Sequence, residues 1–157
     1  MMVWADALRW LHVVGAAVLL GTGVGIAFFM LMAHRTRDPA LIAHVAHTVV
    51  IADFIFTATA VVVQPVTGVA LANKVGWPLG TPWLLWSLAL YVVTGLCWLP
   101  VTWIQVRLRN LARSASASAK PLPEAYDRLF RLWLVLGFPA FASVLAIVWL
   151  MVARPAL

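Results

Sequence analysis

The stretch that decides the fold is residues 8–38, LRWLHVVGAAVLLGTGVGIAFFMLMAHRTRD, a long apolar run that ends in a basic cluster. A membrane-spanning helix needs about 20 mostly apolar residues, so this run is long enough to cross a bilayer. Of the 157 residues, 64% are hydrophobic and only 10% are charged. A chain this short cannot bury so much apolar surface, and the alternating pattern of a β-barrel is absent. The sequence therefore predicts an all-α integral membrane protein.

Three further apolar segments follow the first, and each is bounded by residues that favour turns. Pro39 follows the first segment, GWPLGTP follows the second, and the flexible SASASAKPLPE follows the third. The first segment begins almost at Met1 without a basic leading region, so we expect no cleavable signal peptide. We predict one membrane domain over residues 1–157, with helices at about 4–33, 41–72, 82–106 and 129–153 and a cytoplasmic loop at about 107–128.

The distribution of Lys and Arg predicts how the four helices are oriented. Three cations lie on one side of the expected membrane: Arg9, Lys74 and Arg154. Eight lie on the other: Arg35, Arg37, Arg107, Arg109, Arg113, Lys120, Arg128 and Arg131. The positive-inside rule then places both termini of the four-helix bundle outside and both basic loops in the cytoplasm. Because the net charge of +6 gathers at the ends of the spans, its expected partner is the lipid bilayer and not nucleic acid.

His12 is the one histidine expected deep in the outer half of the membrane. It lies about 12 Å below the boundary marked by Trp4, at a rise of about 1.5 Å per residue. The same depth on the other three helices is reached at Gln64, Tyr91 and Ser143. Ionisable groups inside a membrane usually face the bundle interior. The sequence therefore predicts one polar layer formed by these four side chains.

The other three histidines are expected elsewhere. His34 is far along the same helix from His12, about 33 Å on an unbroken helix, so the two cannot bind one atom. His44 and His47 are three residues apart on one helix face. They could hold a metal at the cytoplasmic end of the second helix, or they could lie among anionic headgroups.

Three more residues carry alternative interpretations. Met30 shares a face with His34, and thioether with imidazole suits copper(I). Asp53 lies well inside the second segment, where it could relay protons or make a structural hydrogen bond. The single cysteine, Cys97, excludes an internal disulfide and is expected to act as a small buried apolar residue.

Small residues lie beside His12 on the first helix. Gly15 and Gly23 fall on or near its face, and Gly21 with Gly25 forms a small-xxx-small pair on the flank. Small residues allow two helices to approach closely. They would equally allow a flat macrocycle to lie against the backbone.

Three stretches resemble a known membrane family: residues 8–38, then QPVTGVALANKVGWPLGTPWLLWSLALYVVTGLCWLP at 64–100 and YDRLFRLWLVLGFPAFASVLAIVWLMVA at 126–153. They are similar to the bacterial integral-membrane family called domain of unknown function 2269. The resemblance implies a multi-pass protein of the bacterial inner (plasma) membrane, and the distribution of Lys and Arg then predicts both termini on the periplasmic side.

The first-helix pattern, Leu11-His12 followed by Gly15 and Gly21, also resembles two better-understood groups. These are the copper-resistance D-type membrane proteins and the haem-b-containing membrane protoporphyrinogen oxidases. The matching histidine in the oxidases is a haem ligand, so the resemblance implies that His12 is an axial ligand. Those oxidases supply a second histidine near the LALYVV stretch, where this chain has Tyr91, and they carry a lysine that is absent here. A five-coordinate iron, a non-histidine sixth ligand and a dimer with two His12 around one haem all remain open.

The leading hypothesis is a haem-b-binding membrane protein for electron transfer or for quinone- or porphyrin-linked oxidation, which would make it a haem-dependent oxidoreductase. His12 would bind the iron, Arg9 would meet a haem propionate, and the cofactor would lie near Gly15, Gln64 and Tyr91. A second hypothesis is a non-enzymatic subunit, transporter component or assembly factor with a membrane partner or a second copy. A third is copper handling. The chain lacks the motifs of soluble hydrolases and kinases.

Overall fold

The computed structural model describes residues 2–155, and all of its regular structure is helical. The elements are α1 (Met2–Thr36), α2 (Pro39–Ala52), the π-helical turn η1 (Asp53–Thr57), α3 (Ala58–Val75), α4 (Pro82–Ala117) and α5 (Glu124–Ala153). Because α2, η1 and α3 follow one another without a break, the fold has four helical rods, all long and apolar enough to cross a membrane. This confirms the predicted all-α fold with four membrane-spanning helices.

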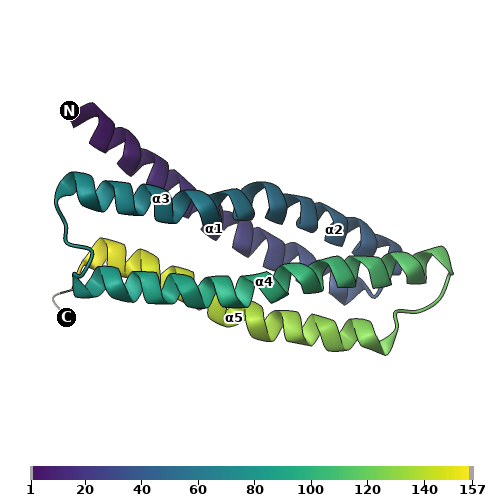
Figure 1. Cartoon of the computed structure of the whole chain (residues 1–157). Helices are drawn as coiled ribbons and strands as arrows, with labels where there is room; N and C mark the ends of the chain where they lie inside the picture. The colour runs from purple at the N-terminus through teal and green to yellow at the C-terminus, as the bar shows by residue number, and fades with distance from the viewer. Residues whose placement is uncertain (1, 156–157) are drawn as a thin grey trace.

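The four rods place both chain termini at one end of the bundle (Figure 1). We call this the terminal end; it also carries the turn between α3 and α4. The opposite end carries the α1–α2 and α4–α5 loops, and we call it the basic end because most of the Lys and Arg residues lie near it. Four crossings therefore bring the chain back to the side on which it began.

Two helix boundaries differ from those predicted. Helix α4 continues to Ala117 where the sequence suggested an end near 106, and α5 begins at Glu124. The predicted loop at 107–128 is therefore wrong, and the connection is reduced to residues 118–123. Residues 107–117 are rich in Arg, Leu and Ala, which are good helix formers. The charged residues mark the end of the apolar, membrane-spanning segment, but the helix continues past them.

The half of the bundle near the basic end is well packed. Its core contains side chains that are completely shielded from solvent: Met30, Ile42, Ile104, Leu108 and Tyr126. The half near the terminal end has only a small buried cluster, formed by Ala72, Trp83, Leu84 and Leu150. Met30, which the sequence suggested as a copper ligand together with His34, packs inside the apolar core near the basic end.

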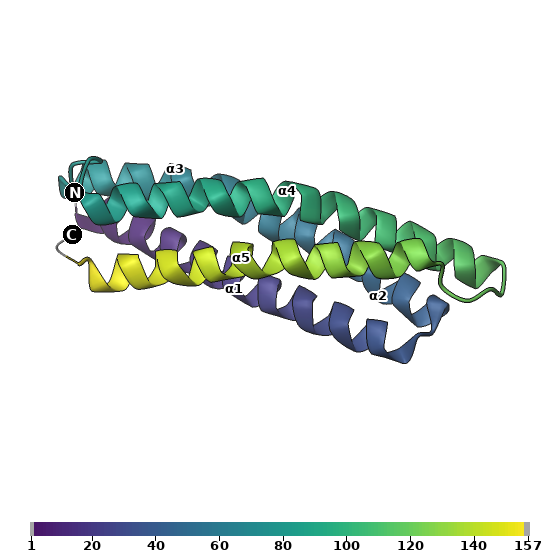
Figure 2. The ribbon, with the colours of Figure 1, turned by 90° about the horizontal axis from the view of Figure 1, so that it is seen from below.

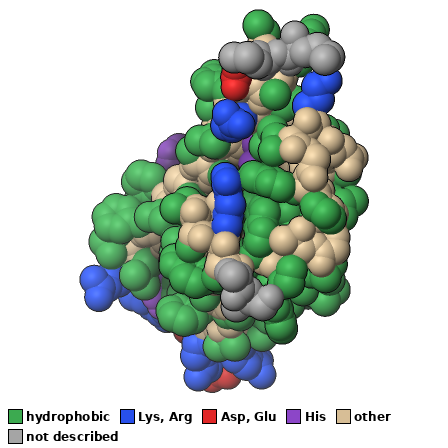
Figure 3. Space-filling model, turned by 90° about the vertical axis from the view of Figure 1, so that its left-hand side faces the viewer, with side chains coloured by type: hydrophobic (Ala, Val, Ile, Leu, Met, Phe, Trp, Pro, Cys, Tyr) green, Lys and Arg blue, Asp and Glu red, His purple; other side chains and the backbone are tan. Residues whose placement is uncertain are grey.

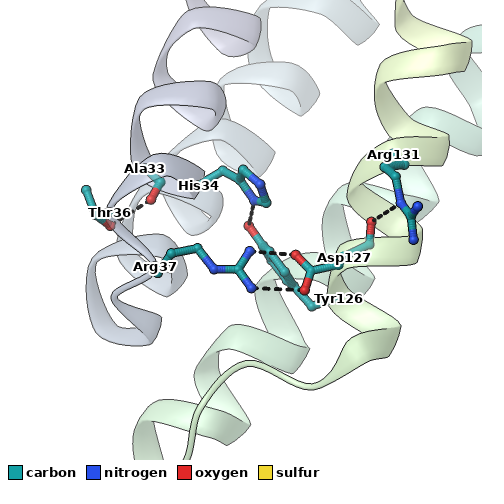
Figure 4. Close-up of polar contacts among 7 residues, drawn as sticks. All are labelled: Ala33, His34, Thr36, Arg37, Tyr126, Asp127 and Arg131. Atoms are coloured by element: carbon teal, nitrogen blue, oxygen red, sulfur yellow. Dashed lines mark hydrogen bonds and ion pairs between the residues drawn. The ribbon is translucent and has the colours of Figure 1, made fainter.

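Hydrogen bonds and an ion pair join the end of α1 to the start of α5 at the basic end (Figure 4). Arg37 donates two hydrogen bonds to Asp127, at 2.6 and 2.9 Å, and this interaction raises the pKa of Arg37. His34 Nδ1 lies 3.4 Å from the Tyr126 hydroxyl, and the His34 ring stacks on Phe130 with centroids 3.8 Å apart. His34 therefore belongs to a structural contact at the end opposite His12.

The rods associate as two pairs that spread apart toward the terminal end (Figure 1). Helix α4 lies along α5 over its length (Figure 2), and α1 packs against α3. Helix α2 packs against α4 near the basic end, whereas α1 and α5 make few contacts. The two cavities described below lie between these pairs.

Truncation of a buried side chain should cost the most stability in the well-packed half of the bundle. We expect Leu108→Ala to lower the free energy of unfolding by about 2–4 kcal/mol, because Leu108 is fully buried. Leu96→Ala on the same helix is the matched control, since Leu96 is 68% exposed and should change stability by less than about 0.5 kcal/mol. Denaturation in detergent measures both. Equal effects would contradict the assigned core.

Candidate functional site

The His12 side chain is held by a hydrogen bond across two helices. Its Nδ1 lies 2.9 Å from Thr67 Oγ1 on α3. The Thr67 hydroxyl has one hydrogen, which it donates to the Val63 carbonyl at 2.7 Å. With that hydrogen on the Val63 carbonyl or on the Gln64 carbonyl, which lies 3.2 Å away, Thr67 can accept from Nδ1–H of His12. We therefore predict the neutral tautomer in which Nε2 carries the free lone pair.

Two glycines allow α1 and α3 to approach closely enough for this contact. The Gln64 amide donates to the backbone carbonyl of His12 at 2.8 Å and occupies the space where Gly15 lacks a Cβ. On the opposite helix, a Cβ at Gly68 would lie only 3.2 Å from Cε1 of His12. Gly15 thus serves helix packing, because the space beside it is already filled by Gln64.

Tyr91 joins α4 to α3 through a backbone group that a proline leaves free. Pro65 has no N–H, so the carbonyl of Val61, four residues earlier, lacks its usual helical donor. The Tyr91 hydroxyl donates to this Val61 carbonyl. In a membrane interior such a carbonyl needs a partner, and the tyrosine supplies it. The hydroxyl of Tyr91 is therefore engaged in the structure itself.

His12 lines a pocket of about 260 Å³ between the two helix pairs, here called the terminal pocket. Its polar lining includes Arg9, His12, Gln64, Ser87, Tyr91 and Arg154, and its apolar wall includes Pro65, Val69, Trp77, Leu84, Leu88, Ile147 and Met151. Viewed end-on, the terminal end shows cationic side chains set among hydrophobic ones (Figure 3). Arg154 lies over the Trp77 ring at 4.4 Å from its centroid, and Arg9 pairs with Asp6 at 3.3 Å. The pocket is therefore apolar inside, with two arginines in its lining.

A second and larger space, here called the inner cavity, lies deeper in the bundle and has a volume of about 500 Å³. Gln64, Tyr91 and Ile147 line both spaces, so they form the boundary between them. Asp53 lines the inner cavity and not the terminal pocket. The two spaces together run between the helix pairs from near the terminal end to the packed core.

The structure brings together most of the residues predicted to share one layer. His12, Gln64 and Tyr91 line the terminal pocket, with Arg9 beside them. Ser143 is buried but lines neither space. Sequence reasoning missed Trp77, Met151 and Arg154, which also line the pocket. The sequence did carry a signal for Trp77. The glycine- and proline-rich turn next to it reverses the chain, and such a turn lies at the membrane surface.

A family profile described as "Predicted integral membrane protein (DUF2269)" matches residues 6–155. The chain belongs to this family. The description assigns membrane insertion to DUF2269 proteins and no activity, and the matched region includes the terminal pocket residue His12. No curated protein and no solved structure matches the chain.

The remaining polar candidates of this DUF2269 protein lie apart from the terminal pocket. His44 and His47 are both exposed on α2. Within residues 2–155, no three His, Cys, Asp or Glu side chains gather in a way that could hold a metal ion. Cys97 is half-buried on α4. His12 is thus the histidine that lines an interior space in the described part of the chain.

The tautomer of His12 can be tested by removing its acceptor. Thr67→Val keeps the shape of the side chain but removes the hydroxyl, so we expect the Nδ1–H form of His12 to lose its dominance. Nitrogen-15 NMR of histidine-labelled protein measures the tautomer. Thr59→Val is the control, because Thr59 is exposed and bonds only to the carbonyl of Ile55. An unchanged His12 signal in Thr67→Val would contradict the hydrogen bond.

Proposed function

We propose that the protein binds haem b in the terminal pocket, with His12 as an axial ligand, and serves electron transfer. The observation that carries this proposal is the arrangement of the imidazole. Nδ1 of His12 lies 2.9 Å from the Thr67 hydroxyl, and the ring lines an interior pocket; the tautomer predicted above leaves Nε2 unprotonated. Metal-ligating histidines typically donate their other N–H to a neighbouring group, which fixes the tautomer and the ring orientation.

The lining of the pocket suits an amphipathic cofactor chemically, and because its volume of about 260 Å³ is smaller than a haem, the two helix pairs would have to move apart to admit one. Its wall is mostly apolar, which suits a macrocycle. Arg9 and Arg154 both line it, from α1 and from the end of α5. Two arginines can make charge-assisted hydrogen bonds to two propionates. The polar edge of a haem would then face the terminal end, and its apolar edge would face the bundle.

One of the side chains that line the pocket offers a soft donor for the second axial position. The Tyr91 hydroxyl donates to Val61 and the Gln64 side-chain N–H donates to His12, so both side chains are already engaged in contacts between helices. Met151 also lines the pocket, from α5, and its thioether is a soft donor. Histidine with methionine is a known ligand pair for haem iron, typical of electron-transfer proteins. We infer that Met151 is the second ligand.

The haem itself supplies one-electron chemistry when bound. The chain would contribute an apolar environment, which limits access of water, and a fixed imidazole, both of which influence the reduction potential.

From the positive-inside rule we expect the terminal end, and with it the pocket, on the periplasmic side of a bacterial inner membrane. The electron partner would therefore reach the pocket from the periplasm or from the bilayer.

Loss of the proposed ligand should abolish haem binding. After expression with added haem, we expect the purified protein to show a Soret band and His12→Ala to lose it. His47→Ala is the matched control, because His47 is exposed on α2, and it should keep the band. Absorption spectra of oxidised and reduced protein measure this. A protein without a Soret band would instead favour a non-enzymatic subunit, which should co-purify with a membrane partner.

Replacing the proposed second ligand should change the spin state of the iron without releasing the haem. We expect Met151→Leu to convert a low-spin spectrum to a high-spin one, because leucine fills the space without offering a donor atom. The absorption spectrum and the electron paramagnetic resonance spectrum both report the change. A low-spin spectrum that survives the substitution would exclude Met151 as a ligand and leave His12 unaffected.

A further inference from the structure

Asp53 is a carboxyl group buried deep within the bundle. It is the first residue of the π-helical turn η1 and is only 2% exposed. Along the rod formed by α2, η1 and α3 it lies about 21 Å from Pro39, given the rise of a helix. This rod is long and apolar enough to cross a membrane. A carboxyl at such a depth needs either a cation or a proton to offset its charge.

No cation pairs with Asp53 within residues 2–155. The ion pairs of this part of the chain, Arg37 with Asp127 and Arg9 with Asp6, lie near the two ends of the bundle. The segments of the four rods around Asp53 contain no Lys, Arg or His: 13–33, 48–73, 83–106 and 132–153. An ionised carboxylate buried without a cation is strongly disfavoured, and such a group usually takes up a proton instead.

The contacts of Asp53 suit a protonated acid. Trp98 of α4 donates its indole N–H to Oδ1 at 3.3 Å, and the Thr102 hydroxyl lies 3.3 Å from Oδ2. Thr102 Oγ1 also lies 3.0 Å from the backbone carbonyl of Trp98, which can take its single hydrogen. The Thr102 oxygen can then accept a hydrogen bond, and a proton on Oδ2 of Asp53 supplies one. In this arrangement both carboxyl oxygens, the hydroxyl and the indole N–H are all paired.

The lengths of these contacts also favour a neutral acid. At the basic end, Arg37 donates to Asp127 at 2.6 and 2.9 Å, whereas both contacts of Asp53 are 3.3 Å long. Hydrogen bonds to an ionised acceptor are typically shorter than those between neutral groups. The two carboxyl groups therefore differ in their surroundings as a charged group and an uncharged group would.

Both helices that meet at Asp53 are irregular at this level. The turn η1 interrupts one of them at Asp53–Thr57, and Pro100 lies inside α4 between Trp98 and Thr102. A proline removes a backbone hydrogen bond from its helix, and π-helical turns occur frequently at functional sites. Within residues 2–155, the side-chain hydrogen bonds that join the two helices here are those of Asp53. The carboxyl thus connects two interrupted helices.

We propose that Asp53 is a proton-binding site in the interior of the bundle. The proton resides on Oδ2 and is donated to Thr102, while Oδ1 accepts from Trp98, so the neutral acid joins η1 to α4. Loss of the proton would leave an anion without a cation between two helices, and the contact with Thr102 would rearrange. Intramembrane carboxyl groups serve in this way in proteins that relay protons. The proposal is independent of haem, because Asp53 does not line the terminal pocket.

Infrared spectra of the full chain at neutral pH, in dodecyl maltoside, test the proposal. A protonated carboxyl has a C=O stretching band that is separate from the bands of a carboxylate, and this detergent has no carbonyl group. We expect wild type to show the band and Asp53→Asn to lose it, with the thermal unfolding of the variant unchanged because asparagine is neutral and similar in shape. Asp127→Asn is the matched control, since Asp127 pairs with Arg37, and it should keep the band.

Two further variants test the hydrogen bonds of the acid. Trp98→Phe and Thr102→Val should each shift the band to higher frequency, because each removes one hydrogen-bonding partner. Thr94→Val is the control on the same helix, since Thr94 bonds only to the carbonyl of Leu90, and it should leave the frequency unchanged.

Carbon-13 in the aspartate carboxyl groups of wild type should shift the band, and this measurement serves if Asp53→Asn does not fold. The proposal is overturned if wild type lacks the band, if Asp53→Asn keeps it, or if the carbon-13 label does not move it. It is also overturned if neither Trp98→Phe nor Thr102→Val shifts the band. A band that appears only after sodium is removed would overturn it too, because a cation would then occupy the site in place of the proton.

Discussion

Two hydrogen bonds join α1 to α3 inside the apolar part of the bundle, and the candidate site depends on them. Gln64 donates to the backbone carbonyl of His12, and the His12 ring shares a hydrogen bond with Thr67. Gly15 and Gly68 make room for these contacts. Between helices in lipid, apolar burial drives association only weakly, so close packing and such hydrogen bonds decide which helices pair. The same contacts fix the imidazole that lines the terminal pocket.

The two halves of the bundle have different roles. The half near the basic end is filled by apolar side chains and closed by the contacts of Arg37 and His34 with α5. The half near the terminal end is held open because the two helix pairs spread apart. Tyr91 bridges the pairs there by donating to the carbonyl that Pro65 leaves free. A well-packed half thus supports a more open half, which is a common basis for a ligand site on a small scaffold.

The sequence predicted the number of spans and the return of both termini to one end, because apolar run length and turn residues are local signals. Counting depth along each helix also placed Gln64 and Tyr91 near His12, since helical rise is constant. The end of α4 was missed because charge marks the end of a span and not of a helix. The π-helical turn at Asp53 and the part played by Met151 depend on packing between distant segments, which no local pattern encodes.

We propose that one imidazole, from α1, binds the iron of a haem in the terminal pocket. Pulsed electron paramagnetic resonance of the oxidised protein, loaded with haem and labelled with nitrogen-15 at histidine, measures this directly. We predict coupling of the iron to the ring of one histidine and no second histidine. Coupling to two histidines would contradict ligation within one chain and indicate a dimer that shares the haem. Absence of any histidine coupling would contradict the assignment of His12.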